Sequence, residues 1–317
     1  MTDLRPATAS QQRQHWGSAL RLLVTLLILW LIFRTINMDS VLNVIKQVNI
    51  PLLGLAVLFQ LLSTLLAGYR WYLVMHQLRF GNHAGFYIRS YFKGSFFNQG
   101  LPTSIGGDAI RVVDVAATGF RKRDAFKGVF IDRILGLLGL LLLNLFANAL
   151  QPDLLPKQLF YILNLLVLGG VAGFVLLIFI HRLRWLNRWR ISRFLLSISS
   201  QLQDVMRGLR NTSRQMGLSI VIHILSMINI FLIGRSVGLS YDIVTFTIIV
   251  PPVILLTLVP ISLAGWGVRE GAMIGLFTLI GADQSIVLSM SILYGIILVV
   301  ASLPGLYVYL YGKHHHV

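Results

Sequence analysis

Long apolar stretches restrict this chain to folds that a lipid bilayer can solvate. Six of them approach or exceed the roughly 20 apolar residues that a helix needs to cross the hydrocarbon core. Inside lipid every backbone polar group must be bonded within the protein, and an α-helix does this within one segment. The sequence therefore predicts an all-α polytopic membrane protein. The six predicted spans are 19–36, 51–78, 128–150, 158–180, 216–237 and 286–311.

Charged residues make up only 12% of the 317 residues, against roughly a quarter in soluble domains. We therefore treat residues 1–317 as a single transmembrane domain. The chain has no Cys, which excludes disulfides and Cys-based zinc sites, and we expect no cofactor or metal. Its net charge is +16, but without a soluble domain it has no place for nucleic acid. We expect the basic residues to contact anionic membrane lipids instead.

Two further apolar regions contain charges or helix breakers. Region 84–125 includes Arg89, Lys93 and Arg111, and region 243–281 includes Pro251-Pro252 and a Gly-rich stretch. Each is predicted to be a broken or re-entrant hairpin that enters and leaves on one side of the membrane; two full crossings by each region would fit the distribution of charge equally well. With the six full spans, this gives about eight transmembrane segments.

The distribution of Lys and Arg predicts the orientation, because these residues collect in cytoplasmic loops. The polar connection 181–214 holds eight Arg and a single acidic residue, whereas the connections assigned to the other side hold only Lys46 and Lys157. We expect 181–214 to be a cytoplasmic linker with an amphipathic helix on the inner leaflet; a plain solvated linker is the alternative. The first apolar run lacks a cleavage site and is interpreted as a retained span. Both termini are then cytoplasmic, and the protein lies in the cytoplasmic (inner) membrane.

The two broken regions resemble each other. Residues 102–111 align without gaps to residues 260–269, with four of ten positions identical, including the final Arg. Each half would contain an odd number of full spans, which predicts an inverted repeat with halves 19–150 and 158–311. Inverted repeats with broken helices are typical of transporters, in which the substrate binds near the middle of the membrane where the broken helices meet.

Ionisable residues at the breaks are the candidate site, because burying them in a membrane is costly. We predict that Arg111 and Arg269 bind the phosphate of a lipid headgroup, since a guanidinium can donate two hydrogen bonds to phosphate oxygens. Backbone N–H groups at the glycines would add to this anion site. The alternative is that Asp108 and Glu270 pair with these arginines only to hold the hairpins together. The full candidate set is Ser104, Gly106, Gly107, Asp108, Arg111, Asp132, Arg133, Ser262, Gly265, Gly267, Arg269 and Glu270.

Two buried polar positions are given simpler roles. Asp132 is expected to pair with an Arg, and His223 to be a packing histidine. The terminal His314-His315-His316 is expected to be a solvated tail.

At these motifs the sequence resembles the transmembrane region of lysylphosphatidylglycerol synthases, also called the flippase-like domain. Asp132 and Ala264 stand where that family more often has Glu and Gly. The motifs that carry the resemblance are Asn98-Gln99-Gly100-Leu101-Pro102, Gly106-Gly107-Asp108 with Arg111, Asp132-Arg133 with Gly136-Leu137, and Pro260-Ile261-Ser262 with Gly265-Trp266-Gly267-Val268-Arg269-Glu270-Gly271.

The resemblance implies a transporter rather than an enzyme. It would move an anionic or aminoacylated lipid between leaflets, or act on a polyprenyl (isoprenoid) phosphate or hopanoid-type lipid. Full-length synthases carry a soluble aminoacyl-transfer domain after this region; the present sequence ends at Val317, so lysyl transfer is not expected. Two alternatives are a membrane-embedded lipid-phosphate transferase or hydrolase, and a non-transporting accessory subunit of an envelope lipid pathway.

Overall fold

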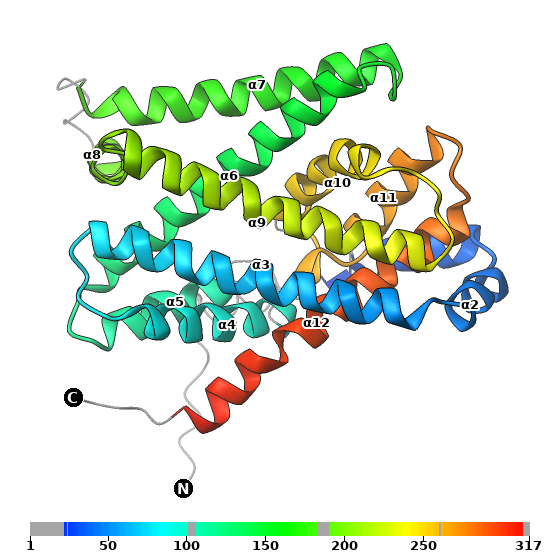
Figure 1. Cartoon of the computed structure of the whole chain (residues 1–317), viewed down its shortest axis with the longest axis horizontal. Helices are drawn as coiled ribbons and strands as arrows, with labels where there is room; N and C mark the ends of the chain where they lie inside the picture. The colour runs from blue at the N-terminus through cyan, green and yellow to red at the C-terminus, as the bar shows by residue number, and fades with distance from the viewer. Residues whose placement is uncertain (1–21, 24, 101–105, 183–189, 260, 313–317) are drawn as a thin grey trace, which may run out of the picture.

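The computed structural model describes residues 22–23, 25–100, 106–182, 190–259 and 261–312 (Figure 1). These residues are helical or form short connections, and none of them is in a strand. In chain order the helices are Thr25–Thr35, α2 (Met38–Lys46), α3 (Ile50–Gln77), α4 (Ala84–Gly100), α5 (Gly106–Ala116), α6 (Lys122–Leu150), α7 (Lys157–Phe179), α8 (Arg190–Val205), α9 (Leu209–Ser236), α10 (Ile243–Leu258), α11 (Val268–Thr278) and α12 (Gln284–Tyr311), with 3₁₀ turns η1 (Ile180–Arg182) and η3 (Leu263–Gly265).

Five helices among the described residues are long and apolar enough to cross a membrane: α3, α6, α7, α9 and α12. They confirm the all-α polytopic class and correspond to five of the six predicted spans. The sixth, at 19–36, is described only in part. Its helix Thr25–Thr35 bends by 89° into α2, so the bent pair counts as one further span or as a re-entrant segment.

Both broken regions consist of two shorter helices, α4 with α5 and α10 with α11. The longest of these has 17 residues, short of the roughly 20 that a span requires. The break between α4 and α5 at 101–105 lies outside the described residues. The second break contains η3, where Ala264 has a φ of +47° and Gly265 a φ of +81°.

An antiparallel pair, α3 and α9, forms the centre of the molecule (Figure 1). The two helices are joined by side chains that pair across the interface. Ser63 Oγ donates to Ile222 O (3.1 Å) and lies 3.0 Å from Ser226 Oγ. Asn229 Nδ2 donates to Gln60 Oε1 (2.8 Å). Polar groups in a span are costly unless they pair in this way, so these bonds fix the register of the two helices.

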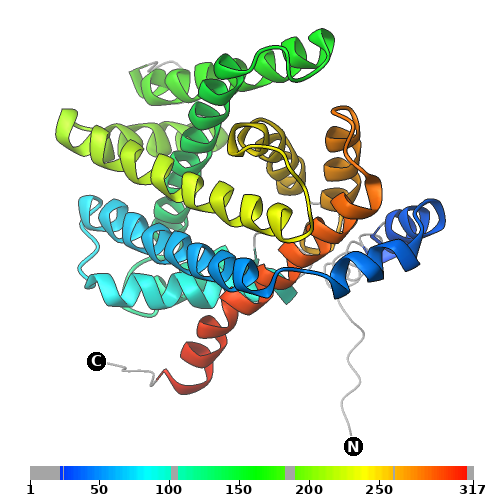
Figure 2. The ribbon, with the colours of Figure 1, turned by 45° about the vertical axis from the view of Figure 1, so that its right-hand side comes forward.

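The helices that follow exchange partners between the two halves of the chain. Helix α4 packs against α12, and α10 packs against α6; Figure 2 shows α12, in red, running past α4. Gly305 on α12 lies directly against the backbone of Phe92, where any side chain would collide, and the rings of Phe97 and Tyr309 meet edge-on 5.0 Å apart. The inverted repeat itself stays a prediction. The boundaries 19–150 and 158–311 stay predictions.

Helix α10 continues through two prolines because another helix supplies the bonds that they remove. Pro251 and Pro252 have no N–H, which leaves the carbonyls of Thr247 and Ile248 without their usual partners four residues later. The amide Nδ2 of Asn144, on α6, donates to both carbonyls at 3.0 Å. Residues 245–253 of α10 are buried, so no water would otherwise satisfy these groups.

The predicted basic linker 181–214 contains the helix α8. Its Ile198, Leu202 and Val205 are buried in a core cluster with residues of α3, α6 and α7, while Arg193 is exposed. Helix α8 is therefore amphipathic. Its location on the cytoplasmic side of the membrane stays a prediction.

Candidate functional site

A carboxylate buried in α6 binds two arginines from different helices. Asp132 is 1% exposed. Its Oδ1 accepts from Nε (3.1 Å) and Nη2 (2.9 Å) of Arg70 on α3, and its Oδ2 accepts from Nη2 of Arg111 on α5 (2.6 Å). Arg70 also donates to the hydroxyl of Ser219 on α9 (2.9 Å). These bonds connect α3, α5, α6 and α9, and they confirm that Asp132 pairs with arginine.

A second carboxylate bridges two arginines at the start of α5. Asp108 Oδ1 accepts from Arg111 Nη1 (3.0 Å) and Arg133 Nη2 (3.1 Å), and Asp108 Oδ2 accepts from Arg133 Nε (2.8 Å). The side chain of Asp108 is 13% exposed and that of Arg133 is 40% exposed. We call Arg70, Asp108, Arg111, Asp132 and Arg133 the first-half cluster.

Aromatic rings and close backbone contacts hold Arg111 in place. Its guanidinium carbon lies 4.1 Å from the ring centre of Trp71 and 4.6 Å from that of Tyr91, which are cation–π distances. Its Nε is buried and has no hydrogen-bond partner among the described residues. Gly107 packs directly against Gly94 of α4, so α5 can approach α4 closely only because neither residue has a side chain.

The second break carries a separate arginine–carboxylate pair. Arg269 donates from Nε (3.0 Å) and Nη2 (2.7 Å) to Glu270 Oε1. The same oxygen accepts from the hydroxyl of Ser291 on α12 (3.1 Å), and Glu270 Oε2 accepts from the backbone N–H of Gly267 (2.6 Å). The guanidinium of Arg269 lies 4.5 Å from the ring centre of Trp266. Glu270 is 0% exposed and Arg269 is 6% exposed, so this pair is almost completely buried.

The structure thus divides the predicted residues between two places. Asp108, Arg111, Asp132 and Arg133 come together in one cluster that begins beside Gly106 and Gly107, and Gly267, Arg269 and Glu270 in another. Arg111 and Arg269 share no hydrogen-bond partner among the described residues. Ser262 is buried and directly precedes η3, the turn that ends at Gly265. Ser104 lies outside the described residues, as do His314-His315-His316.

Sequence reasoning missed Arg70, the residue that links the first-half cluster to α9. The signal was present, because Arg70 is the one formally charged side chain in the apolar stretch 51–75. His223 on α9 behaves as expected for a packing histidine, with its Nε2 lying 2.8 Å from the carbonyl of Gly136. The described residues contain no group of three or more His, Asp or Glu able to hold a metal ion.

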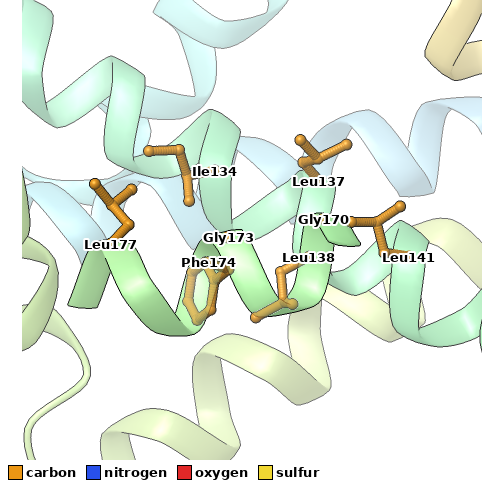
Figure 3. A pocket seen from close by; sticks show the side chains of 8 residues that line it. All are labelled: Ile134, Leu137, Leu138, Leu141, Gly170, Gly173, Phe174 and Leu177. Carbon is orange, nitrogen blue, oxygen red and sulfur yellow. The ribbon is translucent and has the colours of Figure 1, made fainter. Parts of the chain in front are cut away.

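An apolar groove of about 170 Å³ lies between α6 and α7 (Figure 3). Every side chain that lines it is hydrocarbon, so the groove suits an acyl or isoprenoid chain and not a charged group. Two glycines on α7 leave room at its wall. The lining residues are Ile134, Leu137, Leu138 and Leu141 of α6 and Gly170, Gly173, Phe174 and Leu177 of α7.

Comparison with known proteins gives one family match. The model of the family described as the lysylphosphatidylglycerol synthase TM region matches residues 18–305, which is nearly the whole chain and includes both clusters and the groove. The search of curated proteins found no match.

Proposed function

The chain belongs to the family of the lysylphosphatidylglycerol synthase transmembrane region, and on this premise we propose that it moves an anionic or phosphate-bearing lipid between the leaflets of the cytoplasmic membrane. The family supports a role with membrane lipids, and the proposal adds transport and the charge of the substrate. The observation that carries it is a pair of buried arginines, Arg111 and Arg269, each placed on a short helix of a broken region and each held by a carboxylate.

Buried arginines of this kind suit a headgroup phosphate. Guanidinium groups donate in a fixed fork that matches two phosphate oxygens, and they remain charged at every physiological pH. In the absence of lipid, Asp108 pairs with Arg111 and Glu270 with Arg269, so neither arginine is buried without a carboxylate partner. A headgroup would compete with these carboxylates for the arginines.

Alternating access follows from the same arrangement. Each break joins two helices that are shorter than a full span, and each broken region packs against a span of the other half. Movement of one half against the other would expose the arginines to one leaflet and then to the other. We propose that the headgroup travels past the breaks while its hydrocarbon chains stay in lipid.

A leaflet-resolved assay with the full-length protein in liposomes tests this function. Arg111→Lys and Arg269→Lys keep the charge but lose the fork, so each should slow transport of labelled anionic lipids by about tenfold or more. Glu270→Gln should change the transport rate without abolishing lipid binding. Folded yield and transport are measured on the same preparations.

Two results would contradict the proposal. If the arginines only hold the hairpins together, the variants will lose thermal stability while the protein that does fold transports normally. Wild-type rates in well-folded Arg111→Ala and Arg269→Ala proteins would exclude the site. Chromatography of the lipids after the assay separates transport from the alternative of a lipid-phosphate transferase or hydrolase, which would leave chemically altered lipid.

A further inference from the structure

Asp108 is the least firmly held carboxylate of the two clusters. It accepts hydrogen bonds only from Arg111 and Arg133 among the described residues. A phosphate in its place could accept from the same two guanidinium groups, so the donors that now bond Asp108 would keep an acceptor after the exchange. Asp108 is also partly open to its surroundings, at 13% exposure.

Displacing Glu270 or Asp132 would cost more free energy than displacing Asp108. If Glu270 moved away, the backbone N–H of Gly267 and the hydroxyl of Ser291 would lose their acceptor in a fully buried place. If Asp132 moved, Arg70 would lose its charge partner inside the bundle. Of the three carboxylates, Asp108 is therefore the one suited to be displaced.

The charge and the hydrogen-bond donors of the first-half cluster also favour binding of an anion. It contains three arginines and two aspartates and so carries one surplus positive charge. In addition, the Nε of Arg111 is buried without a partner among the described residues. A surplus charge and an unused donor inside a membrane protein are both stabilised by a bound anion.

The apolar groove begins beside this cluster on the same helix. Leu137 lines the groove and lies four residues after Arg133 in α6, so both side chains project from one face about 6 Å apart along the helix axis. A molecule with a phosphate at Arg133 can therefore extend a hydrocarbon chain along Leu137 and Leu141. Inorganic phosphate has no hydrocarbon chain that could occupy this groove.

We infer that a phosphate-bearing lipid binds between Arg111 and Arg133 by displacing Asp108, with one of its hydrocarbon chains in the groove between α6 and α7. This inference rests on the proposed function and makes it more specific. It assigns the first binding step to the first half of the chain, at a stage when the Arg269–Glu270 pair is still closed.

The test measures binding of fluorescent phosphatidic acid to the full-length protein in maltoside detergent, with diacylglycerol bearing the same label as the phosphate-free probe. Arg133→Gln should weaken phosphatidic acid binding by about tenfold or more, because it removes two charge-assisted bonds. Arg123→Gln is the matched control, since it removes an equal charge from an exposed position of the same helix, and its affinity should stay within about twofold of wild type.

Two further variants test displacement and the groove. Asp108→Asn removes the competing charge and should tighten phosphatidic acid binding by about threefold or more. Gly173→Leu adds a side chain where the structure has open space; it should fill the groove and weaken binding of the lipid by about threefold or more. Diacylglycerol should respond to Gly173→Leu and not to Asp108→Asn.

Several outcomes would overturn the inference. If Asp108→Asn binds phosphatidic acid no more tightly than wild type, Asp108 is not displaced by the lipid. If Arg133→Gln and Arg123→Gln weaken binding equally, the lipid is attracted only by the overall positive charge and not by a specific site. If inorganic phosphate competes away the probe at submillimolar concentration and Gly173→Leu has no effect, the site takes phosphate and not lipid. If Arg133→Gln does not fold, the test is the increase in melting temperature that phosphatidic acid causes. This increase should be larger in Asp108→Asn than in wild type.

The inference and the proposed function fail in different ways. If these binding results are negative while the wild-type protein still moves labelled lipids in liposomes, the proposed function stands and only the location of the site is wrong. If the binding results are positive and no lipid of the panel is transported, the site stands and the proposed transport fails.

Discussion

At the scale of single residues, the first-half cluster depends most on Asp132. This carboxylate accepts from two arginines on two helices and is 1% exposed. Such a pairing adds little net stability over a well-packed apolar core, but loss of one partner is costly because it leaves the other charge buried and unpaired. Here one change would leave both Arg70 and Arg111 without their shared partner.

Asp132→Asn should therefore lower the free energy of unfolding by about 3–5 kcal/mol. Asp124→Asn provides the control on the same helix, because Asp124 pairs with Lys127 at a position that is 43% exposed, and its loss should cost less than about 1 kcal/mol. Thermal unfolding of both variants in one detergent measures the difference. A loss for Asp132→Asn no larger than for Asp124→Asn would show that Arg70 and Arg111 find other partners.

The same cluster shows how far the sequence predicts the site. Asp108, Arg111, Asp132 and Arg133 were identified because ionisable residues are rare in apolar stretches, and the structure brings all four together. The sequence indicated the Asp108–Arg111 pair, which is three residues apart. It did not indicate the pairs Arg70–Asp132, Arg111–Asp132 and Arg133–Asp108, because these join positions 21 to 62 residues apart. It also suggested one site shared by Arg111 and Arg269, but their bonding partners are different. Whether they act on one headgroup stays a prediction.

At the scale of helices, the positions of the apolar spans follow from hydropathy alone, whereas the reasons for the irregular helices do not. Pro251 and Pro252 were among the residues expected to interrupt region 243–281. The structure instead continues α10 to Leu258, because Asn144 bonds the two carbonyls that the prolines leave open. The break itself comes later, around η3. A partner more than 100 residues away cannot be recognised from a local pattern.

Asn144→Ala should destabilise the protein by about 2–4 kcal/mol, because two buried carbonyls lose their donor. In a background with Pro251→Ala and Pro252→Ala, backbone N–H groups become available to the same carbonyls, and the cost of Asn144→Ala should fall below about 1 kcal/mol. Unfolding free energies of the four proteins form a double-mutant cycle. Equal costs in both backgrounds would mean that the amide of Asn144 does not replace the missing helix bonds.

The start of α10 should make stability depend on acid. Asp242 caps this helix by accepting from the N–H of Thr245 (2.8 Å) and also accepts from Gln151 (2.8 Å). The hydrogen bond from the backbone of Thr245 is the main cause that lowers the pKa of Asp242 below its ordinary value. A carboxyl with a lowered pKa stabilises the fold above its unfolded pKa of about 3.9, and this contribution is lost as pH falls through the folded pKa.

Asp242→Asn retains a capping oxygen but cannot titrate. We expect wild type to be more stable than this variant at pH 6, and the difference between their melting temperatures to shrink as the pH is lowered below about 4. A difference that stays constant from pH 6 to pH 3 would show that the charge of Asp242 contributes nothing at this cap.

At the scale of the whole molecule, the orientation in the membrane is predicted from the distribution of charge. Residues 181–214 carry eight Arg and one acidic residue, and α8 within them presents an apolar face to α3, α6 and α7. These observations favour a helix at the inner leaflet, with its arginines near anionic headgroups. The predicted topology therefore places this segment and both termini in the cytoplasm.

Single cysteines test the topology directly, because the natural chain contains none. A Cys at Ser197 should resist an impermeant maleimide in intact cells and react after the cells are opened. A Cys at Asp153, between α6 and α7, should react in intact cells and serves as the control. The reverse pattern would invert the predicted orientation.

The exchange of partners between the two halves has a consequence for how the chain enters the membrane during synthesis. Helix α4 leaves the ribosome early, but the helix that covers it, α12, is among the last to be made. Until Gly305 reaches the backbone of Phe92, the face of α4 that α12 covers in the complete protein has no partner. We therefore expect a nascent chain that stops before α12 to be retained by the insertion machinery and degraded, even though four complete spans precede the stop.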